Sequence, residues 1–478
     1  MRLPLLLLCF HGDSIHRRHN HGGVVPRKGP MLAGSLSRWR PTSGKPRFLG
    51  SLLPPGRFFF LPFFLSFFSL VQFKKEKGLL QSHCRMVSQI TGLGTLIVTP
   101  LIGNLSDRYG RKALLALPMT TAIIPLAILA YDRSRAYFYA YYIIKMLTGM
   151  FCEGSMQCLS LAYVADKVGE RRRATAFGVF SGVSAAGFVS GTLSSRFLST
   201  SSTFQVSAIV AVIAAVYMRL FLVETDRGVA GGGGEEEASQ PLCSTPSSDG
   251  ESSPRLPALP KLPSLEDMIG LVRGSSTLSR AAVVVFFNSF AESGVQSALL
   301  YFLKAQFQFS KDQFADLLLI IGIAGAFSQL LLMHLLIPTL DEEKLLNIGL
   351  LASCAHLFLY SIAWSYWVPY LAAIFVVLSI FIQPCIRSIV SKKVGPNEQG
   401  MAQGCITGIS SFASIISPFI FTPLTAWFLS EDAPFKFKGF SIMCAGFASL
   451  IAFVLSIMMR AAPPTTSQKL VNGIYVQA

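Results

Sequence analysis

Apolar runs of about twenty residues are the feature that most limits how this chain can fold. Eleven of them follow residue 86, with short polar segments between most of them. A helix needs about 20 mostly apolar residues to cross a bilayer, so each run predicts a membrane span. The runs lie at about 87–105, 113–131, 137–164, 174–197, 204–223, 281–303, 314–337, 345–364, 367–390, 401–429 and 438–459.

The composition agrees with a lipid environment. The chain has 478 residues, of which 51% are hydrophobic and only 14% are charged, whereas an average soluble domain is about 25% charged. We therefore predict an all-α membrane protein that is not an enzyme, since the apolar spans exclude a soluble one. The net charge of +16 is expected in cytoplasmic loops and not on nucleic acid.

The front of the chain is atypical. Residues 1–48 are basic and are predicted to be a disordered segment, with a transit peptide as the alternative. The run at 58–73 is only 16 residues long and is followed by Lys74, Lys75 and Lys77, which break the expected charge pattern if this run is the first helix. We therefore predict 11 or 12 spans, with an N-terminal helical bundle over 49–223.

A polar linker divides the two sets of spans. Residues 224–280 are rich in Gly, Glu, Ser and Pro, cannot build a core, and are predicted to be a flexible cytoplasmic tether. A C-terminal helical bundle is predicted over 281–460, with a polar tail over 461–478.

The two sets of spans are related by an internal repeat. When residue i is set against residue i+226, Val164 falls on Val390 and Gly169 falls on Gly395, and Gly178 and Gly182 fall on Gly404 and Gly408. This ungapped agreement predicts duplicated six-helix bundles related by a pseudo-two-fold axis, an arrangement found in transporters.

A ten-residue polar joint, 103–112, connects the first two of these eleven runs. It holds two glycines that permit close backbone approach or positive φ, and one acid, Asp107, among three cations. Asp107 is expected to pair with those cations or to accept hydrogen bonds from the N-terminus of another helix. Basic residues are concentrated at 108–112, 167–173 and 392–393, so these segments are predicted to be cytoplasmic.

The pattern Gly-x-Leu-Ser-Asp-Arg-x-Gly-Arg-Lys at 103–112 resembles the loop 2–3 signature of the major facilitator superfamily. Segments 151–156, 163–166 and 182–191 are similar to hippocampus-abundant-transcript-like transporters, which resemble tetracycline efflux proteins. The resemblance runs from about Gln89 to about Arg460. It implies the major facilitator fold and a conformational gate formed by Gly103, Asp107, Arg108, Gly110, Arg111 and Lys112.

Polar residues recur at helical spacing inside three of the apolar runs. Because ionisable groups in a span are costly, roughly +2.5 to +3.5 kcal/mol each, they are expected to face the bundle interior. In the resembling family, helices one, four, seven and ten line a central cavity, and the stripes fall on three of these. The substrate or coupling candidates are Lys145, Glu153, Gln157, Asn288, Glu292, Gln296, Gln383 and Arg387. Lys145 is expected to pair with Glu153 or Asp107, and hydrogen bonding that only stabilises the bundle is the alternative for the whole set.

We therefore predict a secondary active transporter of a small organic solute that works by alternating access, with proton coupling left open. A non-transporting receptor or sensor of the same fold and a facilitative sugar uniporter are the alternatives. The expected partners are the lipid bilayer, a small-molecule substrate and protons, with no nucleic acid and a monomeric state. No cofactor, metal or nucleotide motif is visible. The chain is predicted to be a multi-pass integral membrane protein of the plasma membrane or an endomembrane.

Overall fold

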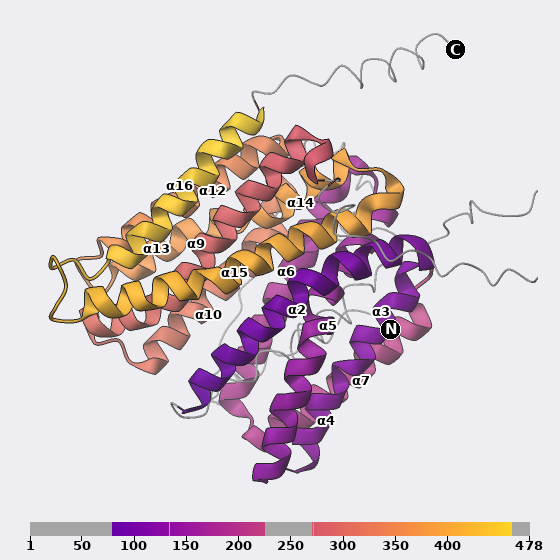
Figure 1. Cartoon of the computed structure of the whole chain (residues 1–478), viewed down its shortest axis with the longest axis horizontal. Coiled ribbons are helices and arrows are strands. Elements are labelled where there is room, and N and C mark those ends of the chain that lie inside the picture. The colour runs from indigo at the N-terminus through magenta and orange to yellow at the C-terminus, as the bar shows by residue number, and fades with distance from the viewer. Residues whose placement is uncertain (1–78, 133, 225–269, 271, 461–478) are drawn as a thin grey trace, which may run out of the picture. The chain divides into compact units, whose positions relative to one another are not determined.

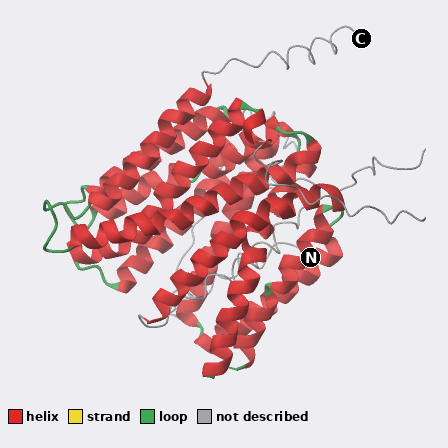
Figure 2. Cartoon of the chain, in the orientation of Figure 1, coloured by secondary structure: helices red, strands yellow, loops and turns green. Residues whose placement is uncertain are grey.

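The N-terminal half consists of helices at the predicted spans (Figures 1 and 2), but the first begins at Leu79, eight residues before the predicted span 87–105, and the span 113–131 is divided into two helices. A computed structural model of the chain describes residues 79–132, 134–224, 270 and 272–460. The predictions for 1–48, 58–73, most of the linker and the tail concern segments outside these residues. The helices are α2 (Leu79–Tyr109), α3 (Arg111–Thr121), α4 (Ile123–Tyr131), α5 (Arg135–Lys167), α6 (Arg173–Phe197) and α7 (Thr200–Phe221).

The C-terminal half repeats this pattern. It begins at Ser276, five residues earlier than predicted, because the helix extends into the polar end of the expected linker. Its elements are α9 (Ser276–Phe307), α10 (Lys311–Phe327), η2 (Ser328–Leu332), α11 (Met333–Leu336), α12 (Glu342–Ser361), α13 (Val368–Ser379), α14 (Ile382–Lys393), η3 (Pro396–Glu398), α15 (Gln399–Leu429) and α16 (Phe440–Arg460).

Nine helical stretches in the described residues are long and apolar enough to cross a membrane. Together with the family resemblance reported below, they make the chain a multi-pass integral membrane protein with an all-α fold. Two predicted spans, α2 and α5, are not among the nine although they are 31 and 33 residues long. The polar side chains of α5, among them Lys145 and Glu153, lower its hydropathy.

The duplication is visible in the helix boundaries. α5 ends at Lys167 and α14 ends at Lys393, which is 226 residues later. Each is followed by a three-residue turn, η1 (Glu170–Arg172) or η3, and the next helix begins at Arg173 or at Gln399, again 226 apart. The predicted repeat is therefore present as repeated local structure.

Two seams join the halves. α2 lies along α15, as Figure 1 shows, and α6 packs against α10 and η2. Glycines line both seams at positions related by the repeat: a Cβ on Gly408 would lie 3.1 Å from the carbonyl oxygen of Leu96, and one on its equivalent, Gly182, would lie 2.8 Å from Cγ of Leu330. Small residues allow this close packing of membrane helices.

A break in the predicted span 367–390 is stabilised by a neighbouring element. The proline ring of Pro384 is incompatible with a helical bond to the carbonyl of Ile380, so α13 and α14 are separate helices. Two carbonyls at the break accept bonds from the π-helical turn η2: Ser328 Oγ donates to Val377 (2.6 Å) and Gln329 Nε2 donates to Ile380 (3.4 Å).

Candidate functional site

The signature segment is helical over most of its length, and the expected ten-residue loop is wrong. α2 continues through Asp107 to Tyr109, and α3 begins at Arg111. Only Gly110 separates the two helices, with φ of 96° and ψ of 153°. A non-glycine residue rarely adopts this φ, which accounts for the glycine. Since one residue makes the turn, the charged side chains are held by helices on both sides.

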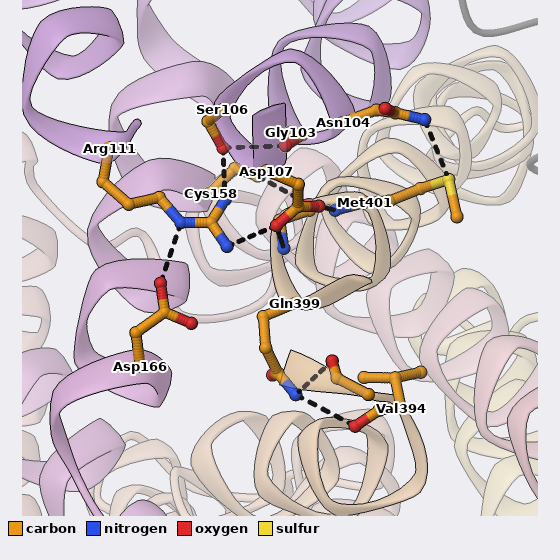
Figure 3. A network of polar contacts seen from close by, with 12 residues as sticks. Gly103, Asn104, Ser106, Asp107, Arg111, Cys158, Asp166, Val394, Gln399 and Met401 are labelled. Carbon is orange, nitrogen blue, oxygen red and sulfur yellow. Dashed lines mark hydrogen bonds and ion pairs between the residues drawn. The ribbon is translucent and has the colours of Figure 1, made fainter. Parts of the chain in front are cut away.

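Asp107 caps a helix of the other half (Figure 3). Its carboxylate accepts hydrogen bonds from the backbone N–H groups of Gly400 (3.0 Å) and Met401 (2.9 Å). These are the second and third residues of α15, whose N–H groups have no partner within the helix. Glu398, which precedes α15, makes no side-chain cap bond. Asp107 therefore supplies the cap that α15 lacks locally, and the contact predicted for this carboxylate is present.

Arg111 holds Asp107 in place. Its guanidinium is completely buried, forms ion pairs with Asp107 and with Asp166 (3.0 Å), and donates to Ser106 Oγ. The two carboxylates are only 5% and 7% exposed. Asp166 lies near the end of α5, so Arg111 joins the two predicted cytoplasmic segments 108–112 and 167–173 (Figure 3). A rigid, fully paired guanidinium of this kind fixes the direction in which Asp107 points.

The backbones of α2 and α15 touch at this contact. Gly103 lies against Gly400, and a Cβ added to Gly103 would lie 2.7 Å from the carbonyl carbon of Gly400. The buried thiol of Cys158 in α5 donates to the Gly400 carbonyl at 3.4 Å. Gly400 is therefore held by α2 and α5 together. We call the set Gly103, Asp107, Arg111, Cys158 and Gly400 the latch.

Among the described residues, no hydrogen bond or ion pair joins the remaining cations of the signature to α15. Arg108 and Lys112 lie at its outer edge, where the backbone N–H of Lys112 donates to Glu224 Oε1 at 3.0 Å. Other contacts at the same end link the predicted cytoplasmic segments: Arg173 Nη1 donates to the Ser391 carbonyl (2.9 Å), and Lys392 pairs with Glu342 (2.6 Å).

The fourth-helix stripe is partly assembled. Lys145 Nζ and Glu153 Oε1 form an ion pair at 2.9 Å, with the side chains 26% and 37% exposed. Both line a cavity of about 50 Å³ between α4, α5 and α7, which has room for a few water molecules. Gln157 is exposed on the same helix. Lys145 therefore pairs with Glu153, one of the two partners expected for it.

The other stripes are not joined to it. In α9, Asn288 is buried while Glu292 and Gln296 are exposed. In α14, Gln383 is half-buried, and Arg387 is 5% exposed. The hydrogen bonds recorded for the described residues do not connect the stripes of α5, α9 and α14.

Arg387 has partners that the sequence analysis missed. Its Nη1 donates to Gln403 Oε1 and to Thr407 Oγ1, both at 3.2 Å. Gln399, one turn earlier in α15, accepts from Ser391 Oγ (2.6 Å) and donates to the Ser391 carbonyl (2.9 Å), which fixes the turn into α15. Gln399, Gln403 and Thr407 recur every four residues, so the spacing that identified the other stripes would also have found this one.

Comparison with known proteins identifies the family. The model for the Major Facilitator Superfamily matches residues 58–418 and 281–474. This chain belongs to the major facilitator superfamily. The match begins at residue 58, so it includes the 58–73 run, which lies before the part of the chain covered by the motif resemblance.

Curated relatives in the superfamily are distant. The chain is 25% identical to hippocampus abundant transcript-like protein 1 of Bos taurus and of Homo sapiens over 336 residues, which is 70% of this chain and 62% of each relative. It therefore spans less than two thirds of their length. It is 24% identical to the class E tetracycline resistance protein of Escherichia coli over 68% of this chain and 74% of that protein.

Solved superfamily structures share the fold. The human organic anion transporter MFSD10 (TETRAN) superposes with a TM-score of 0.67 at 19% identity, covering 84% of this chain and all of that chain. The Escherichia coli fucose:proton symporter FucP (N162A) superposes with a TM-score of 0.64 at 12% identity, covering 86% and 99%. The predicted major facilitator fold is confirmed.

Proposed function

We propose that this protein is a secondary active transporter that moves a small organic solute across its membrane by alternating access of its two halves. The observation that supports this most directly is the latch, because a carboxylate of one half caps a helix of the other. Such a contact holds one end of the pathway closed without joining the halves covalently. The names of the tetracycline resistance proteins and of the fucose:proton symporter agree with a small organic solute.

The strength of the latch suits a reversible step. Loss of a helix N-cap costs about 0.5–2 kcal/mol, and alternating conformers typically differ by a few kcal/mol. The cap is therefore strong enough to bias the closed state and weak enough to be released in each cycle. Gly110, Arg108 and Lys112 complete the gate by fixing the turn and keeping the charged end at the cytoplasmic surface.

The test is flux into sealed proteoliposomes across a panel of solutes, with and without a pH gradient. The change Asp107→Asn keeps the size of the side chain but removes the charge that faces Arg111 and the N-terminus of α15. If closure loses 1–2 kcal/mol, transport slows by roughly 5- to 30-fold while the amount of folded protein is unchanged. The matched control is Asp312→Asn, an exposed acid in the first turn of α10. Normal flux in Asp107→Asn contradicts the gate.

Coupling is assigned to Glu153 and Glu292 in the same proposal. Glu153 lines the α5 cavity opposite Lys145, and Glu292 lies in the stripe of α9. The variants Glu153→Gln and Glu292→Gln are expected to lose the acceleration of uptake by a pH gradient and to keep exchange at equal pH. Acceleration that persists in both variants contradicts proton coupling through these residues. Wild-type flux that ignores the gradient favours a uniporter, and absence of flux for every solute favours a receptor.

A further inference from the structure

Two buried arginines of this chain have opposite electrostatic surroundings. Arg111 is paired with two carboxylates, Asp107 and Asp166. Arg387 is 5% exposed and bonds through Nη1 to the neutral side chains of Gln403 and Thr407. The ion pairs recorded for the described residues do not include Arg387. The buried positive charge of Arg111, which has a structural role, is therefore balanced by carboxylates.

An uncompensated buried cation is costly. Charged groups removed from water are normally paired, and a lone arginine inside a membrane span is unfavourable. Moreover, the neutral partners are themselves rigid: Gln403 and Thr407 are 0% and 4% exposed. Gln403 Nε2 donates back to the Arg387 carbonyl (3.3 Å), and Thr407 Oγ1 donates to the Gln403 carbonyl (2.8 Å). These bonds orient the guanidinium through one nitrogen. Its Nε–Nη2 edge, the edge that meets a carboxylate side-on, has no recorded partner among the described residues.

The position of Arg387 relates it to the latch. Gln403 and Thr407 belong to the stretch of α15 that packs on the N-terminal half, where Gly400 meets Gly103 and Gly404 meets Pro100. The guanidinium is bonded to the side chains of both Gln403 and Thr407. It therefore lies beside the contact between the halves, on α14, which also packs against α6 of the N-terminal half. Parting of the halves at the latch exposes this part of α14 and α15 to the cytoplasmic side.

We propose that Arg387, positioned by Gln403 and Thr407, binds the carboxylate or sulfonate group of an organic anion that enters from the cytoplasmic side. This rests on the proposed transport function and specifies its substrate class. A planar guanidinium binds such groups through two parallel hydrogen bonds, and a site shielded from water strengthens both of them. The incoming anion supplies the compensating charge that the fold does not provide.

The test measures binding in the full chain, purified into phosphatidylcholine nanodiscs, by thermal unfolding. The probes are benzoate and benzenesulfonate, the uncharged benzamide of similar shape, and inorganic sulfate. Benzoate and benzenesulfonate are expected to raise the Tm of the wild type, and benzamide and sulfate are not. Arg387→Gln abolishes the shift. Arg387→Lys, which keeps the charge but loses the fork, retains a reduced shift and remains informative if the Gln variant does not fold.

The matched control is Arg280→Gln, which also removes one positive charge. Arg280 lies near the start of α9, and its Nη1 donates to the carbonyl of Met458. This variant is expected to keep the full shift. Three results overturn the proposal: an equal shift with benzamide, a benzoate shift that survives in Arg387→Gln, or a shift with sulfate alone, which means a site for inorganic anions only. The thermal shift measures binding independently of transport. Wild-type protein that binds benzoate but moves no solute therefore contradicts the proposed function and leaves the anion site standing.

Discussion

At the scale of single residues, the contact between Gly103 and Gly400 decides how closely the halves approach. No side chain fits between them, because a Cβ on Gly103 would meet the backbone of α15 and not a flexible side chain that could move away. The hydrogen bonds of Asp107 depend on this approach, since they reach backbone N–H groups one and two residues into α15.

The change Gly103→Ala is expected to weaken closure at the latch while leaving Asp107 in place. The measurement is the rate at which N-ethylmaleimide alkylates Cys158 in a variant whose other eight cysteines, of nine in total, are replaced. Cys158 is fully buried, so a loss of 1–2 kcal/mol in closure speeds its labelling by roughly 5- to 30-fold. The control is Gly169→Ala, where an added Cβ meets nothing within 4 Å. Equal labelling in the two variants contradicts the expectation.

The sequence predicted part of this site. Charge and spacing predicted two kinds of partner for Asp107, the nearby cations and another helix N-terminus, and both are present; for Lys145 they left Glu153 and Asp107 open, and Glu153 is the partner. They did not identify Gly400 and Met401 as the residues that bind the Asp107 carboxylate, because the two residues do so through backbone N–H groups, which carry no sequence signal. Gln403 and Thr407 did carry a signal, a polar repeat every four residues in an apolar helix.

At the scale of helices, proline sets where the spans bend. Pro384 separates α13 from α14, and the carbonyls at the break are met by Ser328 and Gln329 of η2. π-helical turns are rare and tend to occur at functional sites. Here η2 supplies two hydrogen-bond donors to the break between α13 and α14, and it also lies against Gly182 of the other half. The apolar pattern of 314–337 predicted the helix but not the turn, because a π-turn depends on tertiary contacts.

Removing one of these donors is expected to destabilise the C-terminal half. Ser328→Ala leaves the carbonyl of Val377 without its side-chain partner. Hydrogen bonds between membrane helices contribute about 0.6 kcal/mol on average and up to about 1.7 kcal/mol, so the free energy of unfolding in detergent falls by an amount in that range. Ser430→Ala is the control, because Ser430 makes a bond of similar length (2.7 Å) to Trp427 on an exposed turn. A larger loss in the control contradicts the role assigned to η2.

At the scale of the whole molecule, the apolar runs and the 226-residue repeat predicted the architecture. The length of an apolar run identifies a span because the bilayer fixes how long a span must be. The duplication then indicates how the spans are arranged. The signature segment was misjudged as a loop, since polar residues inside a helix end and polar residues in a loop have the same composition. Only Gly110 interrupts the helices there.

The orientation of the molecule follows from its basic residues and can be measured directly. In the cysteine-free protein, Arg171→Cys in η1 is expected to react with an impermeant maleimide only after intact cells are permeabilised, because the basic residues predict that the latch end faces the cytoplasm. Glu431→Cys, in the turn after α15, is expected to react without permeabilisation. Both positions are exposed, so access to the residue itself is not limiting. Labelling in the reverse pattern contradicts the assigned orientation.

The cap that Asp107 provides for α15 has no equivalent at the position related to it by the repeat. α15 is capped by Asp107, whereas Met333, which stands 226 residues after Asp107, has no carboxylate, and Arg172, which precedes α6, makes no side-chain cap bond. The seam between α6 and α10 is therefore fastened less firmly than the seam between α2 and α15. In the proposed transport cycle, we therefore expect the first gap at the latch end to form between α6 and α10, while α2 and α15 stay in contact until Asp107 releases the N-terminus of α15.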